Sequence, residues 1–153
     1  MEKKFKIAGY NIIVSEYSIL PNTVIFTVKK KGNCAEINVH IIEDKAEFGK
    51  LYETYERRGI GLTKGLDVMR YVIEYYLEKK GIKTIYGHTK EKLAKALSKM
   101  GYKVTNEVTN YRIEKEITKN NNPLPLILKK KTKETQLKKK LFIARIFRKN
   151  RVI

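Results

Sequence analysis

Two glycines and two arginines at residues 57–61 have the types and spacing of a phosphate-binding turn. The run Arg57-Arg58-Gly59-Ile60-Gly61 stands between a strand-like segment and a long amphipathic helix. Glycines two residues apart let a loop turn tightly without Cβ clashes, so its amide groups can converge on an anion at the positive end of the helix. The guanidinium groups add further phosphate contacts. The chemistry indicated here is therefore the binding of phosphate.

The surroundings of this turn resemble the GNAT family, the acetyl-CoA-dependent N-acetyltransferases. The family signature is Arg or Gln, two variable residues, then G-x-G or G-x-A, where a helix opens after a central strand. Here Glu56 takes the first position. Downstream, Lys83–Thr89 corresponds to the next strand, and Leu93–Met100 followed by Gly101-Tyr102 is similar to the family's helix ending in Leu-x-Lys-x-Gly-Phe. The resemblance covers residues 24–104.

The resemblance implies acetyl-CoA as cofactor and assigns its binding residues. In the family, the strand before the signature offers backbone groups to the pantetheine arm, and the turn holds the pyrophosphate. The implied cofactor-binding residues are Leu51, Tyr52, Glu53, Arg57, Arg58, Gly59, Ile60, Gly61 and Thr63. A carboxylate at Glu56 repels an anion at short range and departs from the family pattern. The alternative is an ordinary strand–turn–helix in which the glycines only allow the turn and bind no phosphate.

Acetyl transfer to an amine needs a base that removes a proton and an acid that protonates the leaving thiolate. Glu47 is the first candidate for the base, acting through a water, and Glu53 is the second. A solvent-exposed strand glutamate is the competing interpretation. The family's usual acid is a tyrosine at the position that Leu97 occupies here, which favours a slow or inactive protein. Tyr102 is the substitute assigned to catalysis, with Tyr86 and Tyr52 as further candidates.

The remaining reactive side chains predict neither a metal site nor a disulfide. His40 and His88 are too few and too scattered for metal ligation. Cys34 is the only cysteine, so an internal disulfide is excluded and a reducing cytoplasm is the expected location. The longest apolar runs fall short of the ~20 residues of a membrane span.

Hydrophobic periodicity predicts an α+β fold, a mixed and mainly antiparallel sheet with packed helices, and this arrangement agrees with the GNAT-like fold that the resemblance implies. Alternation indicates a meander of four strands, followed by a helix, a strand, a shorter helix and a closing hairpin. The expected strands are Tyr10–Tyr17, Thr23–Lys29, Cys34–Ile42, Ala46–Tyr52, Lys83–Thr89, Tyr102–Asn106 and Tyr111–Ile117. Helical spacing runs from Leu62 to Leu77 with Gly81 as its cap, and Gly101 ends the helix Lys90–Met100.

The connection from Tyr17 to Thr23 is too short for the two helices that the family usually places there. Because those helices shape the acceptor pocket, we expect the acceptor side to be open or to be built by another chain.

Positive charge is concentrated at the C-terminal end. The net charge is +18, and residues 118–153 hold 12 of the 34 Lys and Arg with one acid, Glu134. We divide the chain into a GNAT-like domain (1–117), a linker (118–128) and a basic amphipathic helical tail (129–153). The candidate nucleic-acid contacts are Lys129, Lys130, Lys131, Lys133, Lys138, Lys139, Lys140, Arg145 and Arg148. The tail's alternatives are an anionic membrane, docking of its apolar stripe, and a merely solvated charge run.

Two hypotheses of different classes follow. The first is an acetyl-CoA-dependent N-acetyltransferase whose acceptor is a protein N-terminus, a lysine or a small amine. The second is a catalytically inactive GNAT-fold protein that serves as a basic nucleic-acid-binding or assembly module. Expected partners are acetyl-CoA and an amine, with nucleic acid or an anionic surface for the tail, and a second copy of the chain as a candidate.

Overall fold

The computed structural model describes residues 2–16, 22–49 and 64–128. The chain forms two compact units, Met1–Pro123 and Leu124–Ile153. In the second unit the description covers residues 124–128, where the Leu128 amide donates a 3.0 Å hydrogen bond to the Pro125 carbonyl. Among the residues described, no helix is long and apolar enough to cross a membrane.

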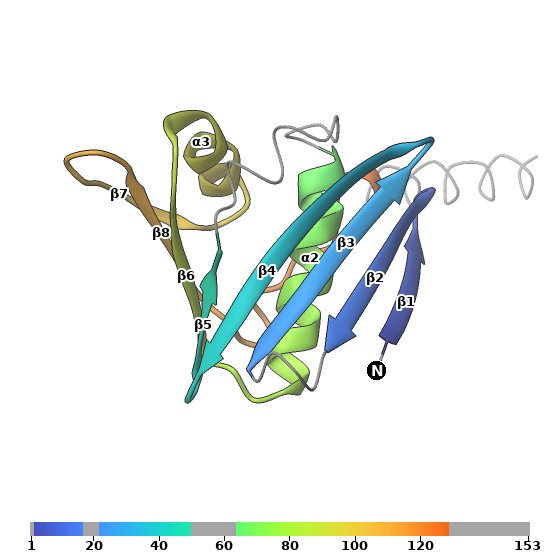
Figure 1. Cartoon of the computed structure of the whole chain (residues 1–153). Helices are drawn as coiled ribbons and strands as arrows, with labels where there is room; N and C mark the ends of the chain where they lie inside the picture. The colour runs from blue at the N-terminus through green and yellow to red at the C-terminus, as the bar shows by residue number, and fades with distance from the viewer. Residues whose placement is uncertain (1, 17–21, 50–63, 129–153) are drawn as a thin grey trace, which may run out of the picture. The chain divides into compact units, whose positions relative to one another are not determined.

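The first unit is built on one eight-stranded sheet (Figure 1). The strand order is β1-β2-β3-β4-β5-β6-β8-β7, and every neighbouring pair is antiparallel except β5–β6. The strands are β1 (Glu2–Ile7), β2 (Tyr10–Glu16), β3 (Thr23–Lys30), β4 (Asn33–Ile42), β5 (Lys45–Phe48), β6 (Thr84–Thr89), β7 (Lys103–Asn106) and β8 (Tyr111–Glu116).

In the described part of the chain, two helices lie on one face of this sheet. Helix α2 (Lys64–Lys79) packs on β2 and β3, and helix α3 (Glu91–Lys99) packs on β7 and β8. Each helix is followed by a glycine with positive φ, Gly81 at +79° and Gly101 at +96°. Glycine has no Cβ penalty in this left-handed region, so it ends a helix at little cost. Both predicted helix ends are confirmed.

Alternation along the strands separates an apolar face from a polar one. Val24, Phe26 and Val28 of β3 are buried, and Phe26 lies opposite Ile37 of β4. The intervening residues point to the opposite face, which neither α2 nor α3 covers. Since side chains alternate with a period of two, the register of each pair carries this division across the whole sheet.

The expected α+β class and the element order up to β8 are confirmed, with one correction, while the predicted helical tail (129–153) lies outside the described residues. The meander before α2 has five strands rather than four, because β1 was not predicted. Lys3, Lys4 and Lys6 obscure the apolar pattern of this strand, which lies at the edge of the sheet. Lysines on an edge strand also oppose pairing with another chain. As expected from the short connection, β2 and β3 pair directly as an antiparallel hairpin, with Glu16 opposite Val24.

A buried cluster of charged side chains joins α2 to β8 and to residues 122–123. Arg70 of α2, only 2% exposed, donates to Oδ1 of Asp67 from Nε (3.0 Å) and Nη2 (2.9 Å) and to Oε2 of Glu74 (3.3 Å). The Nζ of Lys115 lies 2.5 Å from Oε1 of Glu74. Two buried cations therefore face two carboxylates, as the cost of burying charge requires.

The same arginine attaches the segment after β8. Its Nη1 donates to Oδ1 of Asn122 at 2.8 Å, and its Nη2 donates to the Pro123 carbonyl at 2.7 Å. The Asn122 amide in turn donates to the Tyr71 carbonyl at 3.3 Å. Residues 122 and 123 are thus held to α2 within the first compact unit.

Candidate active site

The parallel strands β5 and β6 separate after a short pairing (Figure 1). Their pairing joins Lys45–Glu47 to Thr84–Tyr86, but β6 continues to Thr89 along β8. Beyond β5, the Gly49 amide donates to the Asn38 carbonyl of β4 at 2.8 Å, so the chain follows β4 rather than β6. Within the described residues, the edge of β6 that faces β5 has no strand partner beyond Tyr86.

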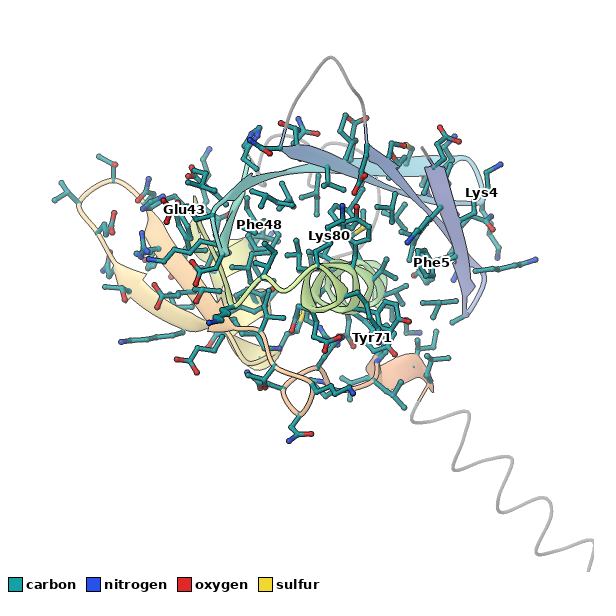
Figure 2. The ribbon with its side chains drawn as sticks, turned by 90° about the horizontal axis from the view of Figure 1, so that it is seen from below. Lys4, Phe5, Glu43, Phe48, Tyr71 and Lys80 are labelled. Atoms are coloured by element: carbon teal, nitrogen blue, oxygen red, sulfur yellow. The ribbon has the colours of Figure 1, made fainter. Side chains whose placement is uncertain are left out.

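Gly87 marks the point of separation. A Cβ built on this glycine would lie 2.8 Å from the Phe48 Cβ, a distance that real Cβ atoms essentially never show. Phe48 is buried on the helix side of the sheet (Figure 2), where its ring lies 6.2 Å from the ring of Tyr102. Glycine at position 87 therefore lets the two backbones approach before they separate.

On the face of the sheet opposite α2 and α3, a row of polar side chains runs across the strands and includes Glu47 and Tyr86. Each residue of this row is the cross-strand partner of the next, so consecutive side chains are neighbours. The polar row consists of Thr23, His40, Glu47, Tyr86, Glu114 and Lys103, from β3, β4, β5, β6, β8 and β7 respectively. Two hydrogen bonds lie within it. Thr23 Oγ1 and His40 Nδ1 are 3.1 Å apart, and the Tyr86 hydroxyl donates to Glu47 Oε2 at 3.1 Å.

The Glu47–Tyr86 hydrogen bond occupies the last paired position before β5 and β6 separate. It raises the pKa of Tyr86 above its ordinary value, and burial and the negative charge of Glu47 act in the same direction. The Arg112 guanidinium opposes this shift. A carboxylate and a protonated phenol are thereby held together where backbone becomes available, an arrangement suited to moving protons to and from a bound ligand.

The structure does not bring Tyr102 and Glu47 together. Tyr102 is 3% exposed on the helix side of the sheet, and its hydroxyl donates to Glu74 Oε2 at 3.3 Å. Burial, with the charge of Glu74, raises the pKa of this phenol well above its ordinary value. Tyr86 rather than Tyr102 thus adjoins the predicted base. Leu97, at the family's usual acid position, is 1% exposed and packs in the core.

Several predicted site residues lie outside the described residues and stay predictions. They are Leu51, Tyr52, Glu53, Arg57, Arg58, Gly59, Ile60, Gly61, Thr63, and, in the tail, Lys129, Lys130, Lys131, Lys133, Lys138, Lys139, Lys140, Arg145 and Arg148. Among described residues, no group of three His, Cys, Asp or Glu could hold a metal. His88 instead lies 3.3 Å from Glu107, and Cys34 is a free, half-buried cysteine.

Sequence reasoning weighed Tyr86 only as a substitute and did not identify Arg112 or Glu114. Alternation alone would have placed Tyr86, Arg112 and Glu114 on polar faces of their strands. What it could not supply is the register, which sets Tyr86 opposite both Glu47 and Glu114.

Comparison with known proteins gives similarity to solved structures only. No family model matches the chain, and no curated protein matches it. One similar structure is assigned as an acyl-CoA N-acyltransferase from Klebsiella pneumoniae subsp. pneumoniae, with 15% identity, a TM-score of 0.46, and coverage of 67% of this chain and 79% of that one. Another is the ribosomal-protein-S18-alanine N-acetyltransferase from Escherichia coli, with 14% identity, a TM-score of 0.47, and coverage of 65% and 72%.

Proposed function

We propose that this chain is an acyl-CoA-dependent N-acyltransferase that transfers an acetyl group from acetyl-CoA to an amine. The observation that carries the proposal is the Glu47–Tyr86 hydrogen bond at the point where β5 and β6 separate. The sequence resemblance implies that the pantetheine arm and the thioester lie beside β5. A base and an acid are then both within reach of one reacting group, as general acid–base catalysis requires.

The proposed reaction forms a C–N bond and breaks a C–S bond. The amine attacks the thioester carbonyl carbon in its neutral form, and Glu47 accepts one proton from the attacking nitrogen, directly or through a water, as the tetrahedral intermediate forms. Collapse of the tetrahedral intermediate expels the thiolate of CoA, and the Tyr86 hydroxyl gives that thiolate a proton. Solvent then returns a proton to Tyr86 and removes one from Glu47, so the products are an amide and a free thiol.

The cofactor is proposed to occupy the residues that the resemblance assigns. Backbone of Leu51, Tyr52 and Glu53 would accept the pantetheine arm, and the turn at Arg57–Gly61, with Thr63, would hold the pyrophosphate. Helix α2 follows this turn, so the positive end of its dipole supports an anion at that place. Acetyl is the acyl group that the resemblance implies.

The acceptor is proposed to approach over the uncovered face of the sheet. The direct hairpin from β2 to β3 leaves no room there for the two helices that shape the family's acceptor pocket. The polar row, with Glu47 in it, lies on the face of the sheet opposite α2 and α3. Protein N-termini, lysines and small amines remain the alternative acceptors.

Calorimetry with acetyl-CoA tests the cofactor part of the proposal. Wild-type protein should bind, whereas Gly59→Val and Gly61→Val should not, because a β-branched side chain blocks the approach of backbone to phosphate. Thermal unfolding of the wild type and of both variants serves as the control for general loss of folding. An absence of wild-type binding at millimolar acetyl-CoA would refute the cofactor assignment.

A non-catalytic alternative is favoured by one observation. Leu97 replaces the family's usual acid with a buried hydrocarbon side chain. In that case the chain is a basic nucleic-acid-binding or assembly module, with a net charge of +18 as the basis of its attraction to polyanions. Binding of acetyl-CoA distinguishes the two proposals, because a module that catalyses no reaction need not bind the cofactor.

A further inference from the structure

The phenol of Tyr86 lies between a carboxylate and a guanidinium. Glu47 accepts its hydrogen bond from β5, and the Cζ atom of Arg112 lies 4.8 Å from the centre of its ring. Arg112 belongs to β8, where its cross-strand partner is His88, so its side chain reaches diagonally to Tyr86. Its Nη2 is 3.1 Å from Oε2 of Glu114, the direct cross-strand partner of Tyr86. Glu114 therefore holds the guanidinium against the ring.

We propose that Arg112, held by Glu114, is a positioning residue for Tyr86 that also stabilises the negative charge developing on the phenol as its proton leaves. The inference rests on the proposed acyltransferase function. A cation over an aromatic ring is attracted to the ring's electron density, and the attraction grows when the ring becomes a phenolate. Arg112 thus stabilises the transition state more than it stabilises the resting protein. An interaction accelerates a reaction only when it meets this condition.

The charges around Tyr86 explain why such a residue is needed. The hydrogen bond to Glu47 raises the pKa of the phenol, which makes it a weaker acid toward a thiolate, and Arg112 acts in the opposite direction. Among the described strands that flank Tyr86, the charged and titratable side chains on its side of the sheet are Glu47 and Lys45 of β5, Arg112, Glu114 and Glu116 of β8, and His88 of β6 itself.

Titration of Tyr86 by NMR tests the geometry without requiring turnover. Protein carrying ¹³C-labelled tyrosine is titrated, and Tyr86→Phe identifies the resonance. We expect Arg112→Gln to move the Tyr86 midpoint to higher pH, and Arg112→Lys, which keeps the charge without the two-pronged donor, to move it less. Lys103→Gln is the matched control, because it removes one positive charge from β7, on the far side of β8 from Tyr86. Equal shifts in Arg112→Gln and Lys103→Gln, or none in Arg112→Gln, would overturn the proposal.

Steady-state kinetics test the catalytic consequence. The probes are acetyl-CoA with spermine and with a lysine-containing peptide, and the release of CoA thiol is followed. Arg112→Gln should lower kcat roughly tenfold, less than the ~10²–10⁴-fold cost of losing a general acid, with KM for acetyl-CoA unchanged. In Arg112→Gln, the alkaline limb of the pH profile of kcat should move to higher pH. Arg112→Lys should restore part of the rate. An unchanged kcat with a shifted titration would refute positioning, whereas a wild type without acetyl-CoA binding would refute the proposed function itself.

Discussion

The Tyr86 hydroxyl donates a hydrogen bond to Oε2 of Glu47 across the one parallel strand pair of the described sheet, at a distance of 3.1 Å. Both residues are at the end of that pairing. Parallel pairing makes this convergence possible, because β5 and β6 run in the same direction and end on the same side. A crossover connection through α2 joins them, so residues 39 positions apart in sequence become neighbours.

Glu47→Gln should lower kcat by ~10²–10⁴-fold while KM for acetyl-CoA changes little, since the variant removes a base and keeps the shape. The measurement is thiol release from acetyl-CoA with a saturating amine. Glu36→Gln is the matched control, because Glu36 lies on the same face in β4 but opposite Thr27. Equal rates for wild type and Glu47→Gln would exclude Glu47, and Glu53 would be examined next.

Tyr102→Phe should reduce stability and have little direct effect on kcat. Tyr86→Phe should instead lower kcat and have little effect on stability. The variant leaves the buried Glu74 without one of its donors, which typically costs ~1–3 kcal/mol. Denaturant unfolding and kcat, measured for both variants, check the contrast. A greater loss of kcat in Tyr102→Phe than in Tyr86→Phe would return the acid role to Tyr102.

The same tyrosine predicts a specific pH dependence of stability. Burial raises the pKa of Tyr102 well above the ordinary tyrosine value of 10.0, so above that pH the unfolded chain ionises this phenol while the folded chain keeps it protonated. The unfolded state then binds fewer protons, and the free energy of unfolding falls as pH rises. The stability difference between wild type and Tyr102→Phe should be constant below pH 10.0 and shrink above it. A constant difference through the alkaline range would contradict this assignment.

Gly87→Ala should destabilise the sheet by ~1–3 kcal/mol, since the new methyl group would meet the Phe48 Cβ at 2.8 Å and cannot be accommodated by rotating a side chain. Thermal unfolding is the measurement. Gly49→Ala is the comparison, because its nearest described neighbours would lie at 3.4 Å. A Gly87→Ala melting temperature equal to that of the wild type would show that β5 and β6 can move apart without cost.

Truncation can separate the compact unit from the basic tail. A chain ending at Pro123 keeps both acceptors of Arg70 beyond β8, whereas one ending at Ile117 loses them. We expect the shorter chain to be less stable by ~1–3 kcal/mol, because buried donors are left unpaired. The chain ending at Pro123 should keep acetyl-CoA binding and lose most of its affinity for DNA or RNA. In the full chain, this affinity should fall steeply as the salt concentration rises. Unchanged polyanion affinity after truncation would remove the tail's assigned role.

The sequence by itself determined the elements and the faces of the sheet. Alternation in β3 and β4, helical spacing from Leu62 to Leu77, and the glycines at positions 81 and 101 are local signals, and local signals depend on neighbours in the chain. They were sufficient for the α+β class and the element order. They failed at β1, where lysines at the sheet edge hide a strand whose place is decided by its pairing with β2.

Tertiary structure alone decided which side chains meet. Tyr86 and Tyr102 were both candidates for the acid, and only the register and the fold showed that one adjoins Glu47 while the other lies buried beside Glu74 on the opposite face. Likewise, Arg70 contacts residues 122 and 123 only because the chain returns to α2 after β8. Such contacts join residues far apart in sequence, so their geometry depends on the pairing of the whole sheet and not on any one segment's pattern.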